Sequence, residues 1–193
     1  MLSDTALDTL FYEARTHQGW LPRDVGDAQL EHLFDLLKWA PTAFNSLPAR
    51  FIFVKSAQAK ATLSACVSPA NAAKIVAAPV TVIVAMDMEF YEKLPQLAPH
   101  MDGRAFFVGN APAIEATAFR NSSLQGAYLM LAARAIGLDC GPMSGFDADK
   151  VNAAFFAGST LKANFICSIG YGDSARLRPR APRLSFEEAC RIV

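Results

Sequence analysis

The sequence predicts a single α+β domain in which one small sheet is covered by helices. Three short apolar runs, rich in β-branched or aromatic residues, have the length of buried strands and lie at 51–54, 80–85 and 164–169. The segments between them place apolar residues at helical spacing. Strands and helices alternate only loosely, and no Gly-x-Gly-x-x-Gly follows a strand. The pattern therefore disfavours a Rossmann dinucleotide fold and favours an α+β layer.

The first half of the chain is expected to alternate between short helices and strands. In order, the expected elements are a helix over 5–16, a helix from Asp27 through Leu37, the strand 51–54, a helix over 59–67 and the strand 80–85. Asp27 is a suitable N-cap, and Ala40-Pro41 ends the second helix because the residue before a proline avoids the helical region. The mixed segment 88–108 predicts a loop with helical turns.

The second half of the chain is expected to centre on a long helix over 113–136. The second part of this helix is apolar nearly all round, which indicates burial, and a second subunit is one surface that would bury it. Gly137 is well placed as the left-handed residue that ends the helix. The remaining elements expected are a helix over 148–156, the strand 164–169 and a helix over 185–191, begun by a capping box of Ser185 and Glu188.

Composition and charge narrow the class of protein. The 193 residues show no repeat and no linker, which predicts one domain over 1–193. Hydrophobic residues make up 52% of the chain, so a buried oligomer interface is expected. Eighteen basic and 18 acidic residues leave no net charge, which argues against a nucleic-acid-binding protein. No run is long and apolar enough for a membrane span, and no signal peptide is expected.

The cysteines and histidines show no catalytic or metal-binding spacing. The four cysteines lie far apart without a Cys-x-x-Cys pair, which predicts reduced, buried thiols in a cytoplasmic protein and no metal site. The three histidines are dispersed, and neither Gly-x-Ser-x-Gly nor His-Glu-x-x-His occurs. No side-chain nucleophile or metal centre is therefore indicated.

Four segments carry residues suited to a ligand. The segment 15–20 combines a positive charge, a hydroxyl and an amide, which suits a phosphate, although a polar loop that ends a helix also accounts for it. Asn45-Ser46 stands between two prolines, and the amide of Asn71 suits a heterocycle edge or a turn. In 141–147, two glycines and a proline allow backbone to approach a flat ligand, but an ordinary connection has similar content.

Taken in order, these segments resemble the FMN-dependent nitroreductase family. Each motif is weak alone, but their order and spacing over the whole chain carry the resemblance. The matching motifs are Arg15-Thr16 after the first helix, the Pro-Ser/Thr-x-x-Asn-Ser-x-Pro loop at 41–48, Gly137-Leu138 before Pro142 to Asp147, and Gly170-Tyr171-Gly172 before Pro182-Arg183-Leu184. Within the family, the stretches 119–123, 141–147, 170–174 and 182–189 are similar to the RutE/HadB-like reductases, which are assigned as malonic semialdehyde reductases of pyrimidine degradation.

The resemblance implies a fold, a partner and a set of cofactor contacts. The implied fold is a small, mostly antiparallel sheet flanked by helices in an intertwined homodimer with two FMN sites. Arg15, Thr16, Gln18 and Arg183 would hold the FMN phosphate and ribityl chain, Asn71 would meet the ring edge, Pro142, Met143, Ser144 and Gly145 would line the ring, and Asn45 and Ser46 would come from the partner. Gln18 stands where many relatives carry a basic residue, so Arg183 is expected to provide more of the phosphate binding.

The implied reaction is a ping-pong hydride transfer from NADH or NADPH to FMN, and then to a small-molecule acceptor. Three functions stay open at this point: a malonic semialdehyde reductase that makes 3-hydroxypropionate, a broad nitroaromatic or quinone reductase, and a non-catalytic FMN-binding protein. A carboxylate substrate needs a cation, for which Arg50, Arg104 and Arg120 are candidates.

Overall fold

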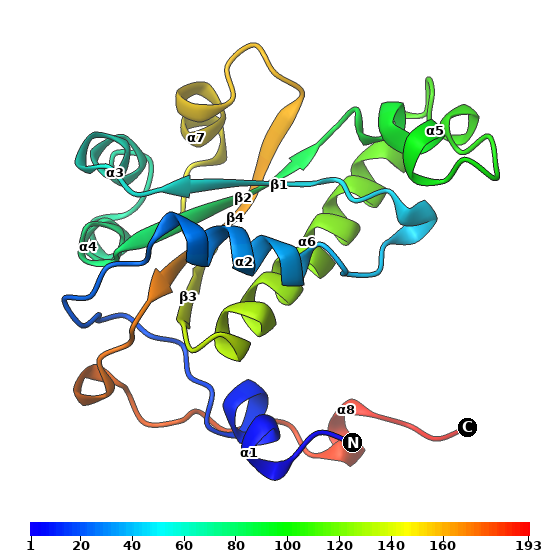
Figure 1. Ribbon diagram of the computed structural model, residues 1–193. Coiled ribbons are helices and arrows are strands. Elements are labelled where there is room, and N and C mark those ends of the chain that lie inside the picture. Colours follow the sequence, from blue (N-terminus) through cyan, green and yellow to red (C-terminus); the bar gives the residue numbers. More distant parts are fainter.

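The centre of the molecule is a four-stranded antiparallel sheet. The computed structural model describes all residues from 1 to 193. Its strands are β1 (Ala49–Val54), β2 (Val80–Asp87), β3 (Asp139–Met143) and β4 (Leu161–Gly170), in the spatial order β1-β2-β4-β3. Every neighbouring pair is antiparallel, which confirms the predicted α+β class with a small antiparallel sheet (Figure 1).

Helices cover both faces of this sheet. They are α1 (Asp4–Leu7), α2 (Asp27–Leu37), α3 (Ala57–Ser64), α4 (Pro69–Ala77), α5 (Leu94–Leu97), α6 (Ala111–Ala135), α7 (Ala148–Phe155) and α8 (Phe186–Ala189). One hydrophobic core joins α2 and α6 to one face, and a second core joins α3, α4 and α7 to the other face (Figure 1). The sheet is therefore the middle layer of three.

Strand β2 belongs to both cores. All eight of its residues are buried. Val80, Val82 and Val84 pack in the core under α2 and α6, whereas Ile83 and Ala85 pack in the opposite core. This division follows the two-residue period of a strand. Burial of one such valine or isoleucine contributes about 1.5–3 kcal/mol, so β2 is the strand that ties the layers together.

The segment after β2 forms a small lobe beside the first half of α6. Short helical turns at Phe90–Lys93 and Arg104–Phe106 flank α5. Buried Phe90, Leu94 and Phe107 pack against Ala118 of α6 in a third core. The lobe stands at one end of the molecule, shown in green at the right of Figure 1. The predicted loop with helical turns over 88–108 is thus confirmed.

Three expectations about local structure are wrong. The first helix ends at Tyr12, after a π-helical turn at Asp8–Tyr12, because residues 16–20 instead bridge to the sheet edge at Cys140 and Gly172. Asn71 lies in α4, a helix that the sequence did not predict, and Pro69 occupies its first turn, where a missing N–H is tolerated. Gly141 and Pro142 lie in strand β3, whose edge position accommodates the proline.

The ends of several helices differ from the sequence-based expectations in smaller ways. Gly26 is the N-cap of α2, and the carboxylate of Asp27 instead pairs with Lys55 at 2.7 Å. Phe34, expected on the buried face of α2, is 46% exposed. Gly137 has a φ of 78°, which confirms the left-handed end of α6. The capping box of α8 is present, but the helix spans only four residues.

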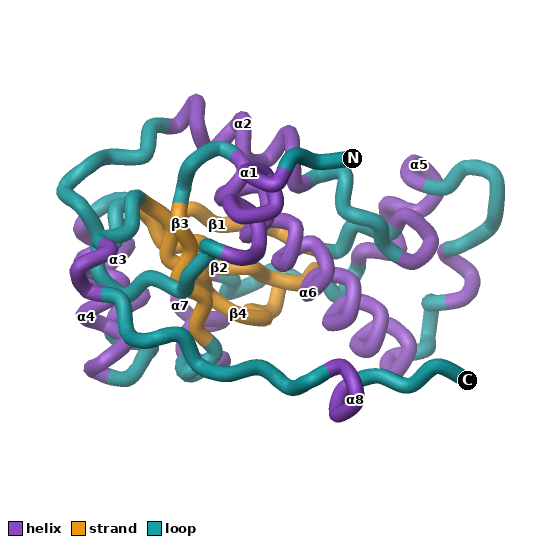
Figure 2. The backbone as a smooth tube through the Cα atoms, turned by 90° about the horizontal axis from the view of Figure 1, so that it is seen from below, coloured by secondary structure: helices purple, strands orange, loops and turns teal.

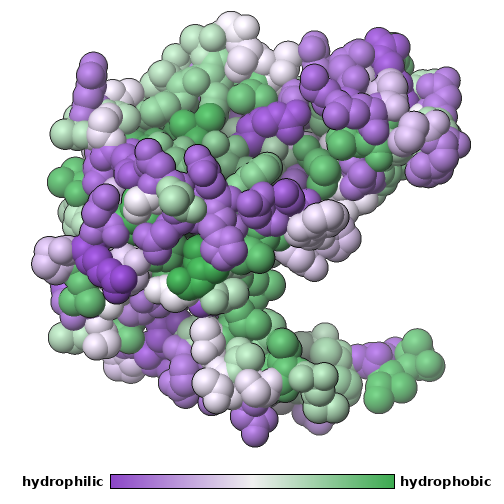
Figure 3. Space-filling view, in the orientation of Figure 1, coloured by the Kyte–Doolittle hydropathy of each residue, from purple (hydrophilic) through white to green (hydrophobic).

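The C-terminal tail leaves the body of the protein. All residues from 178 to 193 are exposed. The tail runs along one side of the molecule toward α8 and the C-terminus (Figure 2), and a hollow separates it from the body (Figure 3). Cys190 is exposed there, contrary to expectation, whereas Cys66, Cys140 and Cys167 are buried and free. No helix is long and apolar enough to cross a membrane.

Candidate functional site

The most distinctive cavity is rich in arginine. It has a volume of about 650 Å³ and lies between the end of the first helical segment, the loop after it and the C-terminal tail. Its lining residues are Phe11, Tyr12, Ala14, Arg15, Thr16, Gln18, Arg134, Arg176, Arg178, Pro179, Arg180, Ala181 and Arg183. Four residues predicted to hold a phosphate and its chain therefore meet in one place: Arg15, Thr16, Gln18 and Arg183. No aspartate or glutamate lines the cavity.

The loop at 15–21 is fixed to the sheet by backbone hydrogen bonds. The N–H of His17 donates to Cys140 O at 2.9 Å, and the N–H of Leu21 donates to Tyr171 O at 2.8 Å. In the opposite direction, the N–H of Asp173 donates to Gly19 O at 3.0 Å. These contacts set where Arg15, Thr16 and Gln18 enter the cavity.

The ring of His17 lies beneath this loop. It is only 7% exposed, and its Nε2 stands 3.4 Å from Asp139 Oδ1. Asp139 also accepts from the N–H of Gly172 at 2.8 Å. A Cβ added to Gly172 would lie 2.0 Å from His17 Nδ1, so the ring fits only because residue 172 is glycine. Sequence reasoning assigned His17 no role, because a dispersed histidine gives no spacing signal.

A second group of predicted residues meets at the end of β3. Asn71 Nδ2 donates to Gly145 O at 2.9 Å, and Lys74 Nζ donates to Asn71 Oδ1 at 3.1 Å. Lys74 was missed in the sequence, since its position one helical turn after Asn71 becomes visible only when α4 is known. Lys74, Gln18, Pro142 and Met143 line a further small cavity of about 30 Å³.

The backbone around Gly141 and Gly145 is open to a close approach. A Cβ on Gly141 would lie 2.4 Å from His17 O, so the strand can approach the loop only through glycine. The N–H of Gly145 makes no hydrogen bond within the chain, and Gly145 and Ser144 are both exposed. Gly145 thus offers a free donor beside Asn71 and Lys74.

Asn45 and Ser46 lie away from these residues. Their loop is tied to α5 by the hydrogen bond from Asn45 Nδ2 to Leu97 O at 2.9 Å. In both Figure 1 and Figure 2, α5 and α4 stand at opposite ends of the molecule. Asn45 is exposed, but Ser46 is 1% exposed and its Oγ has no partner. One chain therefore does not bring this loop to the cavity.

The backbone of this loop is strained. Phe44, Asn45 and Leu47 have φ values of 59°, 51° and 39°, although none is glycine. Each such conformation costs on the order of 1–3 kcal/mol and persists only where the surroundings enforce it. The enforcing contacts include Ala43 N to Asn121 Oδ1 at 2.8 Å and Leu47 N to Thr42 Oγ1 at 3.2 Å. Strain held in place at an exposed asparagine marks the loop as a candidate contact region.

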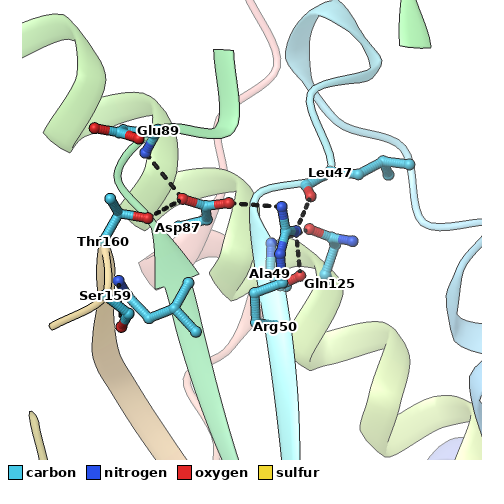
Figure 4. Close-up of polar contacts among 9 residues, drawn as sticks. Leu47, Ala49, Arg50, Asp87, Glu89, Gln125, Ser159 and Thr160 are labelled. Atoms are coloured by element: carbon cyan, nitrogen blue, oxygen red, sulfur yellow. Dashed lines mark hydrogen bonds and ion pairs between the residues drawn. The ribbon is translucent and has the colours of Figure 1, made fainter. Parts of the chain in front are cut away.

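Arg50 helps to hold this loop in place. Its guanidinium donates to Asp87 Oδ2 at 2.7 Å and to the carbonyls of Leu47 and Ala49 at 3.0 and 2.9 Å (Figure 4). Asp87 in turn accepts from Thr160 Oγ1 and from the N–H of Glu89. Arg50 is therefore committed to internal partners and is a poor candidate for a substrate carboxylate.

The other two carboxylate-binding candidates differ from each other. Arg104 holds Glu92 through two hydrogen bonds of 2.8 and 2.7 Å, and this pairing lowers the pKa of Glu92. Arg120 is exposed on α6 and forms no ion pair. Of the three arginines, only Arg120 is free to meet an anion.

The buried thiols are unsuited to nucleophilic chemistry. A hydrogen bond with the Cys140 thiol, together with burial, holds the pKa of Cys167 well above its usual range. Burial likewise raises the pKa of Cys66. Because the thiolate is the reactive form, these cysteines remain inert at neutral pH.

The site as a whole fits a ligand with a phosphate at one end and a flat, hydrogen-bonding ring at the other. Arginines, the Thr16 hydroxyl and the Gln18 amide suit the phosphate and a polyhydroxy chain. The free N–H of Gly145, with Asn71 and Lys74, suits a ring edge that accepts hydrogen bonds. Gln18 lines both the arginine-rich and the small cavity, which joins the two ends. These features fit FMN.

Comparisons with known proteins agree with this arrangement. A family model described as "Nitroreductase family" matches residues 12–171. A protein of Polynucleobacter asymbioticus, provisionally named an NADH dehydrogenase/NAD(P)H nitroreductase, is 60% identical over 193 residues, which cover 100% of this chain and 98% of the relative. A protein of Burkholderia lata with a similar provisional name is 61% identical over 191 residues, 99% of this chain and 98% of the relative.

Solved structures show the same fold. A nitroreductase-like protein of Bacillus subtilis superposes with a TM-score of 0.89 at 24% identity, over 99% of this chain and 100% of the other. One from Exiguobacterium sibiricum, solved in complex with FMN, gives a TM-score of 0.86 at 21% identity, over 100% and 99%. At this level of identity the likeness concerns the fold.

Proposed function

Because the chain belongs to the nitroreductase family, we propose that it is an FMN-dependent NAD(P)H oxidoreductase. The observation that carries the proposal is the continuous site described above, with an arginine-lined cavity at one end and the free Gly145 N–H at the other. The name of the FMN-bound structure of the same fold, and the names of the 60%-identical relatives, support the choice of cofactor and reductant. When bound, FMN supplies the redox chemistry, taking a hydride from NAD(P)H and giving it to the acceptor in two half-reactions.

The chain's own residues bind and orient in this proposal. Arg15, Thr16, Gln18 and Arg183 hold the phosphate and ribityl chain, and the loop at 15–21 owes its position to the sheet. Pro142, Met143 and Ser144 present backbone to the ring beside Gly145, as the close approach at Gly141 allows. Asn71 fixes Gly145 and Lys74 at the ring edge. No side chain needs to act as a nucleophile, which agrees with the protonated state of the buried thiols.

We propose further that two copies of the chain complete the site. Leu184, Phe186 and Ile192 of the tail are each more than half exposed, and the α6 face with Leu124 and Tyr128 is also exposed. Both surfaces are too apolar to remain in water. A homodimer would cover them, and a partner's loop at 41–48 would bring Asn45 and Ser46 to the cavity that their own chain keeps at a distance.

The acceptor that we propose is malonic semialdehyde, which is reduced to 3-hydroxypropionate in pyrimidine degradation. The support is the sequence similarity to the RutE/HadB-like reductases over 119–123, 141–147, 170–174 and 182–189. The reaction adds a hydride to the aldehyde carbon and a proton to its oxygen, while NAD(P)H is oxidised. A carboxylate-bearing acceptor would need a free cation, and of the three candidates Arg50, Arg104 and Arg120, Arg120 is the one without an internal partner.

A second candidate function is the reduction of nitroaromatics or quinones. It is favoured by the names of the 60%-identical relatives and by the internal partners of Arg50 and Arg104, which remove two of the three arginines considered for a substrate carboxylate. The half-reaction with NAD(P)H is the same for both functions. They differ only in which acceptor reoxidises the flavin.

Three measurements test these proposals in sequence. The purified protein should be yellow, or FMN should raise its melting temperature; a colourless protein that FMN does not stabilise would reject the cofactor. Anaerobic NADH or NADPH should bleach the flavin, and failure of both would indicate a non-catalytic FMN-binding protein. Malonic semialdehyde should then restore the colour faster than nitroaromatics or quinones. Faster reoxidation by the latter by orders of magnitude would establish the second candidate.

A further inference from the structure

The arginine-rich cavity holds more positive charge than FMN uses. Its lining includes the six arginines 15, 134, 176, 178, 180 and 183. None of them forms an ion pair, since Arg50 and Arg104 are the arginines that pair with carboxylates in this chain. One phosphate monoester carries only about two negative charges at neutral pH. Roughly four guanidinium charges are therefore left without a counter-charge within the cavity.

Four of the six arginines have internal hydrogen-bond partners. Arg134 donates to Leu10 O at 3.0 Å, and Arg180 donates to the carbonyls of Tyr12 and Ala14. Arg15 donates to Arg178 O, and Arg183 to two carbonyls of its own tail. The bonds of Arg180 and Arg15 join the tail to the first helical segment and the loop after it. The guanidinium groups of Arg176 and Arg178 have no such partner, so they are free to bind an anion.

Arg176 and Arg178 also line a second cavity. It has a volume of about 460 Å³, and its other lining residues are Gln18, Ala70, Ala73, Lys74 and Ala77. No carboxylate lines this cavity either. It shares Gln18, Arg176 and Arg178 with the arginine-rich cavity and shares Lys74 with the small cavity under the proposed ring position. A ligand in it would thus lie beside FMN, with three cations around it.

The stem of Arg176 is fixed in this position. A Cβ on Gly19 would lie 2.5 Å from Arg176 Cδ, so the side chain packs directly over the glycine backbone. The loop that carries Gly19 is itself bonded to the sheet through Asp173. An arginine whose stem is already ordered loses less conformational entropy when it binds an anion. The alanines of α4 add a flat apolar wall opposite the cations.

We propose that Arg176 and Arg178 bind a second phosphate, namely the 2′-phosphate of NADPH. The inference rests on the proposed function, which makes a nicotinamide dinucleotide the hydride donor. NADH and NADPH share their pyrophosphate and differ only at the adenosine 2′ position. The second cavity reaches the ring end at Lys74 and the phosphate end at Gln18, so an anion there belongs to a molecule that lies along the cofactor. The enzyme therefore prefers NADPH to NADH.

The kinetic test follows flavin reduction directly, without an electron acceptor. In anaerobic stopped-flow experiments, the second-order rate constant for flavin reduction by NADPH should exceed that for NADH by at least about tenfold, because NADPH makes two charge-assisted contacts that NADH lacks. Arg178→Gln keeps a polar side chain but removes the charge, and it should remove most of this preference while leaving NADH reduction within about twofold. Arg176→Gln should act in the same direction.

A binding test gives a readout that does not depend on turnover. The oxidised FMN-loaded protein should bind 2′,5′-ADP at least about tenfold more tightly than 5′-AMP in calorimetry, and Arg178→Gln should abolish the difference. Lys162→Gln is the control, because Lys162 is exposed and lies outside all three cavities. It should leave both affinities unchanged. A higher salt concentration should weaken the binding of 2′,5′-ADP more than the binding of 5′-AMP.

The outcomes separate this inference from the proposed function. If FMN binds and is reduced equally well by NADH and NADPH, or if Arg178→Gln slows both donors alike, the 2′-phosphate assignment is wrong although the function stands. If inorganic phosphate inhibits NADH and NADPH equally and Arg178→Gln relieves both, the site binds free phosphate and the assignment is again overturned. If the protein does not bind FMN at all, the proposed function itself fails.

Discussion

At the scale of single residues, His17 connects the sheet to the loop at 15–21, for which we propose phosphate binding. Its backbone N–H is bonded to Cys140, its Nε2 faces Asp139, and its ring fills the space left by the missing side chain of Gly172. Arg15, Thr16 and Gln18 flank it and face the cavity. We therefore interpret His17 as a positioning residue that acts on the cofactor through its neighbours.

We predict that Gly172→Ala weakens FMN binding. The added Cβ would lie 2.0 Å from His17 Nδ1, so the ring and its loop must move. Overpacking of this kind costs about 1–3 kcal/mol, which titration of the apoprotein with FMN would detect as a higher Kd. The double variant His17→Ala with Gly172→Ala is the control, since it removes the clash. If Gly172→Ala has the same effect with and without His17, the contact between the two residues is not the cause.

At the scale of secondary-structure elements, residues of α6, β1 and β2 hold the strained loop around 44–47 in place. Asn121 and Gln125 of α6 accept hydrogen bonds from the loop and from β1, and Asp87 at the end of β2 holds Arg50 of β1 (Figure 4). This network fixes the loop that carries Asn45 to both the sheet and the long helix. It explains how the positive φ values at Phe44 and Leu47 persist.

We predict that Arg50→Leu destabilises the fold and changes the substrate KM only as a consequence. The substitution removes three hydrogen bonds and leaves the carboxylate of Asp87, at 9% exposure, without its cation. The expected loss is roughly 2–4 kcal/mol in the free energy of unfolding, measured by urea denaturation. Arg104→Leu breaks an exposed pair and should lose much less. A raised KM with unchanged stability would return Arg50 to the list of substrate-binding residues.

Gly137 shows which elements the sequence could predict. The end of α6 was predicted from a glycine after the last apolar position, and a φ of 78° confirms the physical reason. Strand β3 and helix α4 could not be predicted in the same way. The glycine and proline of β3 are typical of loops, and the proline is accepted because β3 lies at a sheet edge. Helix α4 has only nine residues, four of them alanine, and so few large apolar side chains give little periodic signal.

We predict that Gly137→Ala destabilises the protein by roughly 1 kcal/mol through its backbone alone, because an L-residue disfavours the left-handed conformation. Nothing lies within 4 Å of the added Cβ, so no steric clash contributes. Gly158→Ala is the matched comparison, because that position is equally open and has a φ of 74°. A thermal unfolding series should show similar losses at 137 and 158; no loss at either position would contradict the backbone explanation.

At the scale of the whole molecule, the sequence grouped residues that the fold brings together. Arg15, Thr16, Gln18 and Arg183 were predicted to share one ligand, and they line one cavity although Arg183 is far from the others in the chain. Lys74 was missed, because its proximity depends on α4. Asn45 and Ser46 lie beyond the reach of the same chain's cavity, so their role stays a prediction about a second copy.

The exposed tail provides the sharpest test of that second copy. Phe186 is 57% exposed in the outer part of the tail, where every residue from 184 to 193 is exposed, so a dimer interface is the surface expected to bury it. Burial of one phenylalanine contributes about 1.5–3 kcal/mol, and twofold symmetry doubles the effect. Phe186→Asp should therefore raise the dissociation constant of the dimer by roughly two to four orders of magnitude in sedimentation equilibrium.

The same substitution should weaken FMN binding, since the proposed site takes the loop at 41–48 from the partner. Val76→Asp is the control, because Val76 is 61% exposed on α4 and lies outside the cavities. It should leave both the dimer and the flavin content unchanged. A Phe186→Asp protein that stays dimeric and fully loaded with FMN would show that the tail is not part of the interface. A monomer that still binds FMN with unchanged affinity would show instead that one chain holds the cofactor by itself, without Asn45 or Ser46 from a partner.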